Sequence, residues 1–426
     1  MAETDSPLSI PTPPSEPGPA RKKVLPKAFT SLQHRNYRLY FGGQLISVAG
    51  TWMQSIAQAW LVYQISQSEF SLGLVGFAGA IPVLVVSPWG GVLADILPRR
   101  TLLVITQASS MLLAFILSVL TFTGVVQVWH IVAMAAMLGL INAFDAPARQ
   151  AFIVELVSRE DLTNAIAMNS IMFNGARVIG PAIGGLILAA LGAGWCFLIN
   201  GLSFLAVITG LLLMQISRPV TRPRIQHPLQ QLKDGVRYAV ARRDIIGLLA
   251  LSSIFGIFGM SYSSQLPAYV DQVYHVDATG FGILSAVVGL GAVSGAFIVA
   301  QFHDRIRRGP LLFYANLTYA ALLLIFSFNP YFPLALVLGF GLGACFMLQM
   351  NNMNSLLQLR VSDQMRGRVM SLYTLTFFGL SPFGSLLVGT LAENWSLTGT
   401  VTLAALVTGA LSLAVFIRIP ELRKLT

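Results

Sequence analysis

The sequence predicts an all-α membrane protein whose twelve transmembrane helices form two pseudo-symmetric six-helix bundles. Three observations support this fold class: the composition, a series of long apolar segments, and an internal repeat. Hydrophobic residues make up 55% of the chain and charged residues 10%, whereas about a quarter of the residues in soluble domains are charged. This composition excludes a soluble globular protein.

The apolar segments set the domain organisation. Roughly twelve of them approach the ~20 residues that a helix needs to cross a bilayer. They predict a disordered tail over 1–30, a first bundle over 31–216, a linker with an amphipathic helix over 217–243, and a second bundle with a short tail over 244–426. The expected spans are 38–64, 72–94, 101–123, 128–146, 162–191, 194–216, 244–270, 280–302, 309–328, 332–353, 366–392 and 397–418.

The second half of the chain repeats the first. A shift of about 204 residues aligns two glycine-rich segments, which is the pattern of transporters built from parallel repeats. A cavity between the two halves, and movement of one half against the other, follow from that architecture. The aligned residues are Phe173, Gly175, Gly180 and Gly185 with Phe377, Gly379, Gly384 and Gly389.

The positive charges are distributed asymmetrically. The formal net charge is +10, and apart from Arg177 the Lys and Arg residues fall in the N-terminal tail, alternate turns, the linker and the C-terminus. The positive-inside rule therefore predicts a multi-pass protein of the inner (cytoplasmic) membrane with both termini in the cytoplasm. Since these charges follow the membrane topology, they do not indicate a nucleic-acid partner. The opposite loops hold only acids, namely Glu69, Asp271, Asp277 and Glu393.

A charged turn between the second and third expected spans carries the most specific motif. It resembles the G-x-L-A-D-x-x-x-R-R loop of the major facilitator superfamily, and this resemblance implies a secondary transporter with a conformational switch at the loop. A second copy is degenerate, because Ala300 replaces its glycine. The motif residues are Gly91, Asp95, Arg99 and Arg100, and those of the second copy are Asp304 and Arg308.

A cytoplasmic gate is expected from the same loop. Asp95 and Asp145 end the second and fourth spans on one side, so Arg99 is placed to bridge them. Asp95 is also placed to cap the eleventh span near Arg366. The alternative is a surface ion pair that contributes about 0–1 kcal/mol. Asp145 is also the best candidate for a titrating group, because partial desolvation raises a carboxyl pKa.

The fifth expected span contains a second motif, which resembles the G-P-x-x-G-G antiporter motif of drug-efflux members. The segment from Asp145 to Arg149 before it resembles the enterobactin-exporter and macrolide-efflux branch. Arg177 lies near or past the membrane midplane, either as a packing residue or as a source of positive potential for an anionic substrate. The motif residues are Gly175, Arg177, Gly180, Pro181, Gly184 and Gly185.

Polar and methionine residues at helical spacing are the candidate cavity walls. In a helix they share one face, and lipid-facing amides are costly, so we expect them to face water or protein. Interhelical hydrogen bonding is the alternative. The resemblance implies that spans one, four, seven and ten line the cavity. The candidates are Gln44, Thr51, Gln54, Gln58, Met137, Asn142, Arg177, Met347, Met350, Asn351 and Asn354.

No catalytic or metal-ligating pattern is evident. The sequence has no Walker A segment, no metal-ligand spacing and no nucleophile–base pair, so we expect no enzyme activity and no cofactor. An ion gradient is then the energy source, with protons favoured by analogy.

Three functions are compatible with these features. A proton-linked exporter of small amphipathic molecules, either drugs or siderophore-like metabolites, is the leading hypothesis, with the chain acting as a monomer in the bilayer. A transporter of lysophospholipid-like substrates is the second, and a non-transporting membrane sensor is the third.

Overall fold

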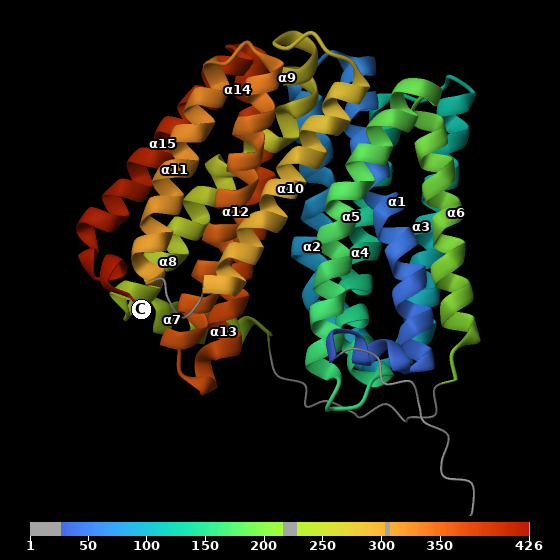
Figure 1. The fold of residues 1–426 in the computed structure, drawn as a ribbon, viewed down its shortest axis with the longest axis horizontal. Coiled ribbons are helices and arrows are strands. Elements are labelled where there is room, and N and C mark those ends of the chain that lie inside the picture. The colour runs from blue at the N-terminus through green and yellow to red at the C-terminus, as the bar shows by residue number, and fades with distance from the viewer. Residues whose placement is uncertain (1–26, 216–227, 303–306, 426) are drawn as a thin grey trace, which may run out of the picture.

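The computed structural model describes residues 27–215, 228–302 and 307–425, and within these ranges the chain forms helices and no strand. Most of the predicted N-terminal tail, the first part of the linker, and Asp304 lie outside the described residues. The helices form two bundles side by side (Figure 1). One end of the molecule carries the start of α1 and the end of α15, and we call it the terminal end; the opposite end is the distal end.

The first bundle contains six long helices. A short 3-10 helix, Lys27–Gln33, precedes them. The six are α1 (Arg35–Ser66), α2 (Glu69–Ile96), α3 (Arg99–Phe122), α4 (Val128–Leu156), α5 (Leu162–Leu191) and α6 (Ala193–Leu213).

The second bundle follows α7 (Pro228–Val240), which occupies part of the segment where an amphipathic helix is expected. Its seventh span consists of α8 (Arg243–Ile254), two short helical turns and α9 (Leu266–Gln272). Its eleventh span consists of α13 (Asp363–Thr374), a short turn and α14 (Ser381–Asn394). The others are α10 (Ala278–Phe302), α11 (Arg308–Phe328), α12 (Phe332–Arg360) and α15 (Leu397–Arg418), and a 3-10 helix, Pro420–Lys424, ends the chain.

Eleven helical segments of the described chain are long and apolar enough to cross a membrane. The first helix, α1, is not among them, because its polar stripe lowers its hydropathy. It nevertheless packs inside the first bundle, where residues such as Gln44 and Ser47 are buried by neighbouring helices. With α1 the fold has twelve membrane-crossing segments in two six-helix bundles, as the sequence predicts.

The seventh and eleventh spans are interrupted by π-helical turns, Phe255–Gly259 and Leu375–Gly379. The two turns pack together: the rings of Phe255 and Phe377 stack with centroids 5.7 Å apart. A Cβ atom on Gly256 would lie 2.5 Å from the carbonyl oxygen of Phe377. Turns of this kind are frequent at functional sites, and here they join two helices that contribute to the cavity described below.

The halves touch through two pseudo-symmetric helix pairs, α5 with α10 and α2 with α14. A Cβ on Gly185 of α5 would lie 2.5 Å from the Cα of Gly282 in α10. In the other pair, a Cβ on Gly389 would lie 2.6 Å from the carbonyl oxygen of Glu69. Small residues allow such backbone approach between membrane helices. Both crossings lie toward the distal end, where the bundles converge, and the bundles separate toward the terminal end (Figure 1).

Candidate functional site

A cavity of about 1050 Å³ lies between the halves. Residues of α1, α2 and α4 line it from the first half, and residues of the seventh and eleventh spans line it from the second. The lining is largely apolar with scattered hydroxyl and amide groups, which is the usual character of small-molecule sites. The polar lining residues are Ser55, Gln58, Ser87, Asn142, Ser263, Ser264, Arg368, Ser371, Thr374, Ser381 and Ser385.

The polar stripe of α1 divides between two environments. Gln58 lines the cavity, as does Asn142 of α4. Gln54, however, accepts a hydrogen bond of 2.7 Å from the Asn200 amide of α6. Gln44 is 1% exposed, and the Thr51 hydroxyl donates to the Ser47 carbonyl at 2.9 Å. Interhelical hydrogen bonding, the alternative from sequence, therefore describes Gln54, because residues on one face of a 32-residue helix meet different neighbours along its length.

The expected wall on α12 is not part of this cavity. Met347 and Met350 pack against the hydrophobic core of the second bundle. Asn351 and Asn354 are half-buried outside the lining, and Asn354 accepts a hydrogen bond from Gln358. On α4, Met137 is 49% exposed and also lies outside it.

The second half lines the cavity mainly through its eleventh span. The available sequence signal was the series of Ser and Thr residues in the segment aligned with the fifth span, including Ser381 and Ser385.

Arg177 lies where the two halves meet. Its guanidinium carbon is 5.7 Å from the ring centroid of Trp52 in α1 and 5.1 Å from that of Phe346 in α12. The neighbouring polar side chain on α5, Asn174, donates its amide to the Ser170 carbonyl. Two aromatic faces therefore surround the charge, and a desolvated cation–π contact is worth about 2 kcal/mol. Arg177 is not among the described residues that line the cavity.

The glycines of the fifth-span motif face different helices. A Cβ on Gly180 would lie 2.5 Å from the Trp52 Cβ of α1, and one on Gly184 would lie 3.1 Å from the Met53 Cα. Gly185 faces α10, as described above, whereas Gly175 faces open space. The buried Pro181 lies between these contacts. The motif therefore holds α5 against α1 of its own half and α10 of the other half.

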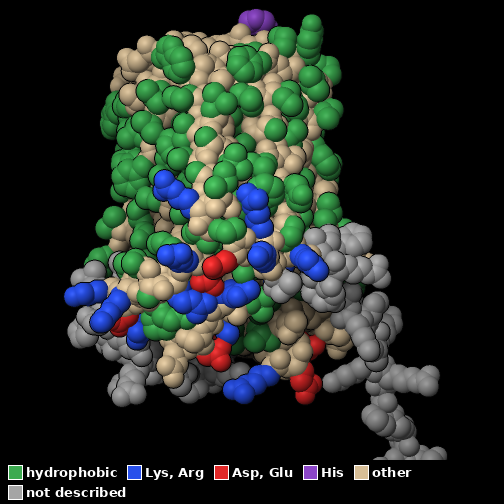
Figure 2. Space-filling view, turned by 90° about the vertical axis from the view of Figure 1, so that its left-hand side faces the viewer, with side chains coloured by type: hydrophobic (Ala, Val, Ile, Leu, Met, Phe, Trp, Pro, Cys, Tyr) green, Lys and Arg blue, Asp and Glu red, His purple; other side chains and the backbone are tan. Residues whose placement is uncertain are grey.

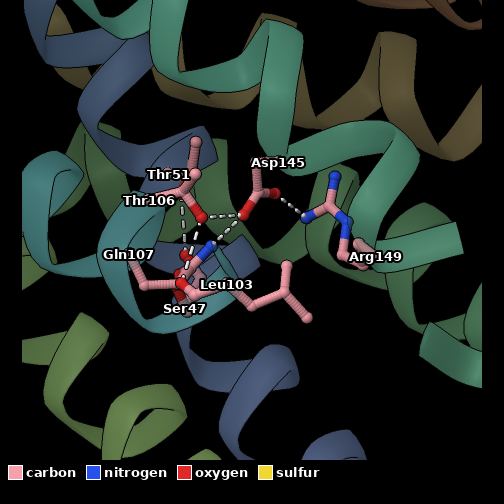
Figure 3. A network of polar contacts seen from close by, with 7 residues as sticks. All are labelled: Ser47, Thr51, Leu103, Thr106, Gln107, Asp145 and Arg149. Atoms are coloured by element: carbon pink, nitrogen blue, oxygen red, sulfur yellow. Dashed lines mark hydrogen bonds and ion pairs between the residues drawn. The ribbon is translucent and has the colours of Figure 1, made fainter. Parts of the chain in front are cut away.

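Asp145 forms a buried network inside the first bundle (Figure 3). Its carboxylate is 2% exposed, and its Oδ1 atom accepts hydrogen bonds of 2.8 Å from Thr106 Oγ1 and Gln107 Nε2 of α3. Arg149 Nη1 lies 3.5 Å from its Oδ2 atom, and the same guanidinium lies over the ring of Phe173 in α5 at 4.8 Å. A buried carboxylate needs such partners, and these join α3, α4 and α5.

Among the described residues, the structure does not contain the expected ion pair between Arg99 and Asp145. Arg99 Nη1 lies 2.5 Å from Glu155 Oε1. Glu155 is about 15 Å closer than Asp145 to the terminal end of α4, at about 1.5 Å per residue, so it lies within reach of the turn. The Asp95 side chain lies outside the described residues.

Other residues of the turn have partners that the sequence did not indicate. The neighbouring Arg100 donates to the Leu212 carbonyl of α6 at 2.6 Å. In α2, Gly90 rather than Gly91 packs closely against α4: a Cβ on Gly90 would meet the Ala143 carbonyl, whereas Gly91 faces open space.

In the eleventh span, Arg366 pairs with Asp363 at 2.5 Å. Arg308, from the second copy of the motif, begins α11.

Hydrogen bonds close the cavity at the distal end, and sequence reasoning missed them. Gln272 Nε2 of α9 donates to Glu69 Oε1 of α2 at 2.5 Å and to the Tyr63 hydroxyl of α1 at 2.7 Å. Glu393 of α14 accepts from Ser68 Oγ at 2.6 Å and from the Phe70 amide at 3.0 Å. We call these contacts the distal latch. The sequence signal for these contacts was the presence of acidic residues in distal loops without Lys or Arg.

Two repeated six-helix bundles with a cavity between them form the architecture of transporters of the major facilitator superfamily. Within that superfamily, the chain belongs to the transmembrane secretion effector family, whose model matches residues 27–425.

Its relatives are transporters of small molecules. The staphyloferrin A transporter of Staphylococcus aureus is 26% identical, over 87% of this chain and 93% of its own. The multidrug efflux pump Tap of Mycolicibacterium fortuitum is 26% identical, over 89% and 95%. The enterobactin exporter EntS of Escherichia coli is 24% identical, over 92% and 94%.

A solved structure shares the fold. An inward-facing bacterial homologue of the human lysosomal transporter Spinster superimposes with a TM-score of 0.68 at 15% identity, covering 94% of this chain and 97% of the homologue.

Proposed function

We propose that the chain is a proton-linked exporter of small amphipathic molecules, drug-like or siderophore-like, that works by alternating access. The observation that carries this proposal is the cavity between the halves with its distal latch. Its walls suit amphipathic ligands, because apolar side chains alternate with hydroxyl and amide groups. Relatives that carry siderophores or extrude drugs support the same substrate class.

The proposal assigns sides to the two ends. Apart from Arg177, the described Lys and Arg residues lie near the terminal end, so the positive-inside rule puts that end, with both termini, in the cytoplasm. The latched distal end then faces outward, and the cavity is in its inward-facing state. We place the protein in the cytoplasmic membrane as a monomer.

Asp145 is the proposed proton-binding residue. It is a carboxylate buried among α3, α4 and α5, and its position in the repeat is taken in α12 by Gln349. The Gln349 amide is fully buried and donates to the Ala315 carbonyl of α11 at 3.2 Å. The two halves thus place a buried polar side chain at the equivalent position, each bonded to the equivalent neighbouring helix, but only the first half has a carboxyl group there.

Transport into proteoliposomes tests the proposal. With the lumen made acidic, we expect uptake of a cationic dye or a siderophore, and collapse of that uptake when a protonophore dissipates the gradient. Asp145→Asn should remove the proton dependence and lower uptake by about a hundredfold or more, the lower end of the range for a positioned proton-transfer group. Asp363→Asn, which changes an exposed carboxylate whose side chain is 86% accessible, is the matched control.

Three outcomes would contradict the proposal. Uptake that survives the protonophore rules out proton coupling, and uptake of a lysophospholipid alone makes the lipid-like reading correct. No uptake of any substrate in protein that is folded and correctly inserted favours the non-transporting sensor.

A further inference from the structure

A second cavity, of about 500 Å³, opens at the terminal end of the second bundle, away from the transport cavity. It forms where α8 begins, where α12 ends, and where the C-terminal segment folds back. We call it the basic cleft. Its charged residues are Arg242, Arg243, Asp244, Arg360, Glu421 and Lys424.

The C-terminal wall of the basic cleft is fixed in place. The Gly309 amide at the start of α11 donates to the Leu425 carbonyl at 2.8 Å. Leu422 and Leu425 are 0% and 3% exposed. Gly247 of α8 packs so closely on this segment that a Cβ there would lie 2.9 Å from Leu422 Cδ1. The cleft is therefore a built concavity.

Its charges do not cancel. Asp244 neutralises Arg242 through two hydrogen bonds, of 3.1 Å from Nε and 2.9 Å from Nη2. Arg243, Arg360 and Lys424 are exposed, form no ion pair with a described residue, and share the cleft with the single remaining acid, Glu421.

Exposed apolar side chains also occur on the helices that lead into the basic cleft. Leu359 precedes Arg360 and is 63% exposed, Ile246 lies one turn into α8 at 38%, and Ile417 near the end of α15 is 63% exposed. Figure 2 shows the same arrangement over this face, with Lys and Arg gathered toward the lower end beneath a mostly hydrophobic surface. The cleft therefore lies where the apolar surface meets the charged end of the molecule.

We infer that the basic cleft binds the phosphate of an anionic phospholipid headgroup from the leaflet at the terminal end. Arginine forks bind phosphate oxygens through paired hydrogen bonds. The exposed leucine and isoleucines give the acyl chains an apolar surface, which a free phosphate ion does not need. A bound headgroup would connect α8, α12 and the C-terminal segment. This inference does not depend on the transported substrate.

Native mass spectrometry tests it directly. Protein stripped of lipid in neutral detergent is titrated with phosphatidylglycerol, and with phosphatidylcholine as the uncharged comparison. The test variant combines R243Q, R360Q and K424Q. The control combines R35Q, R38Q and R159Q, which removes three exposed charges from the terminal end of the first half. We expect the test variant to bind phosphatidylglycerol about tenfold or more weakly, and the control to change binding by less than about twofold.

Equal weakening in both variants, or no preference for phosphatidylglycerol in the unaltered protein, would overturn the inference. Inorganic phosphate provides a further arm. If millimolar phosphate displaces the lipid completely, the cleft is a site for free phosphate and the lipid assignment is wrong. If the lipid stays bound, the headgroup and its chains act together as inferred. None of these measurements depends on transport.

Discussion

At the scale of single residues, the buried Asp145 and the half-buried Arg177 lie in different kinds of environment. Asp145 is surrounded by hydrogen-bond donors and a cation from its own bundle, so the described partners of its carboxylate all belong to the first half. Arg177 contacts aromatic rings from both bundles. From sequence, Arg177 had two readings, packing or substrate attraction. Its position outside the cavity lining favours packing between the halves.

Substitutions of Arg177 distinguish a packing role from attraction of an anionic substrate. We expect Arg177→Gln to lower transport of an anionic siderophore and of a cationic dye to the same extent, because a lost contact between the halves affects every substrate. Arg177→Lys should recover part of the loss, since it keeps a cation but not the planar stacking. In a cycle with Phe346→Leu, which removes the ring contributed by the other half, the two stability losses should be less than additive, by about 0.5–2 kcal/mol. Selective loss of the anionic substrate would restore the role in substrate attraction.

At the scale of helices, sequence patterns predicted where the helices lie along the chain better than which residues of neighbouring helices they contact. Segment lengths and the repeat were sufficient for the twelve spans. They did not predict the π-helical turns, which form where Gly256 of the seventh span packs against Phe377 of the eleventh. Nor did they separate Gln54 from Gln58, because the two share one face and only the packing of α6 distinguishes them. Glu155 was not predicted as a partner of Arg99, because the sequence does not show which carboxylate of α4 lies beside the turn.

The crossing of α5 with α10 gives a matched pair of glycine substitutions. Gly185→Ala adds a methyl group 2.5 Å from the Gly282 Cα, whereas Gly175→Ala adds one to open space. Both changes raise helix propensity equally, so any difference reports packing. We expect Gly185→Ala to destabilise the protein by about 1–3 kcal/mol, as in other overpacked sites, and Gly175→Ala to leave stability unchanged or higher. Thermal unfolding in detergent measures both, and equal behaviour would refute the assigned crossing.

At the scale of the whole molecule, the halves are joined at the distal end and apart at the terminal end (Figure 1). Glycine crossings and the distal latch supply these contacts. Since both crossings are related by the repeat, the same surfaces can serve as the axis about which one bundle moves against the other. We therefore expect the distal latch to open when the terminal end closes.

Distances between spin labels on the two halves test this claim most directly. One pair, at Gln64 and Asn394, reports the distal end, and a second pair, at Arg159 and Gln364, reports the terminal end; all four positions are exposed. Both native cysteines are buried and are replaced in the labelled background. We expect Glu69→Gln, which weakens the distal latch, to lengthen the distal distance and shorten the terminal distance in the same molecules. Distances that stay fixed, or that lengthen together at both ends, would contradict alternating access in this protein.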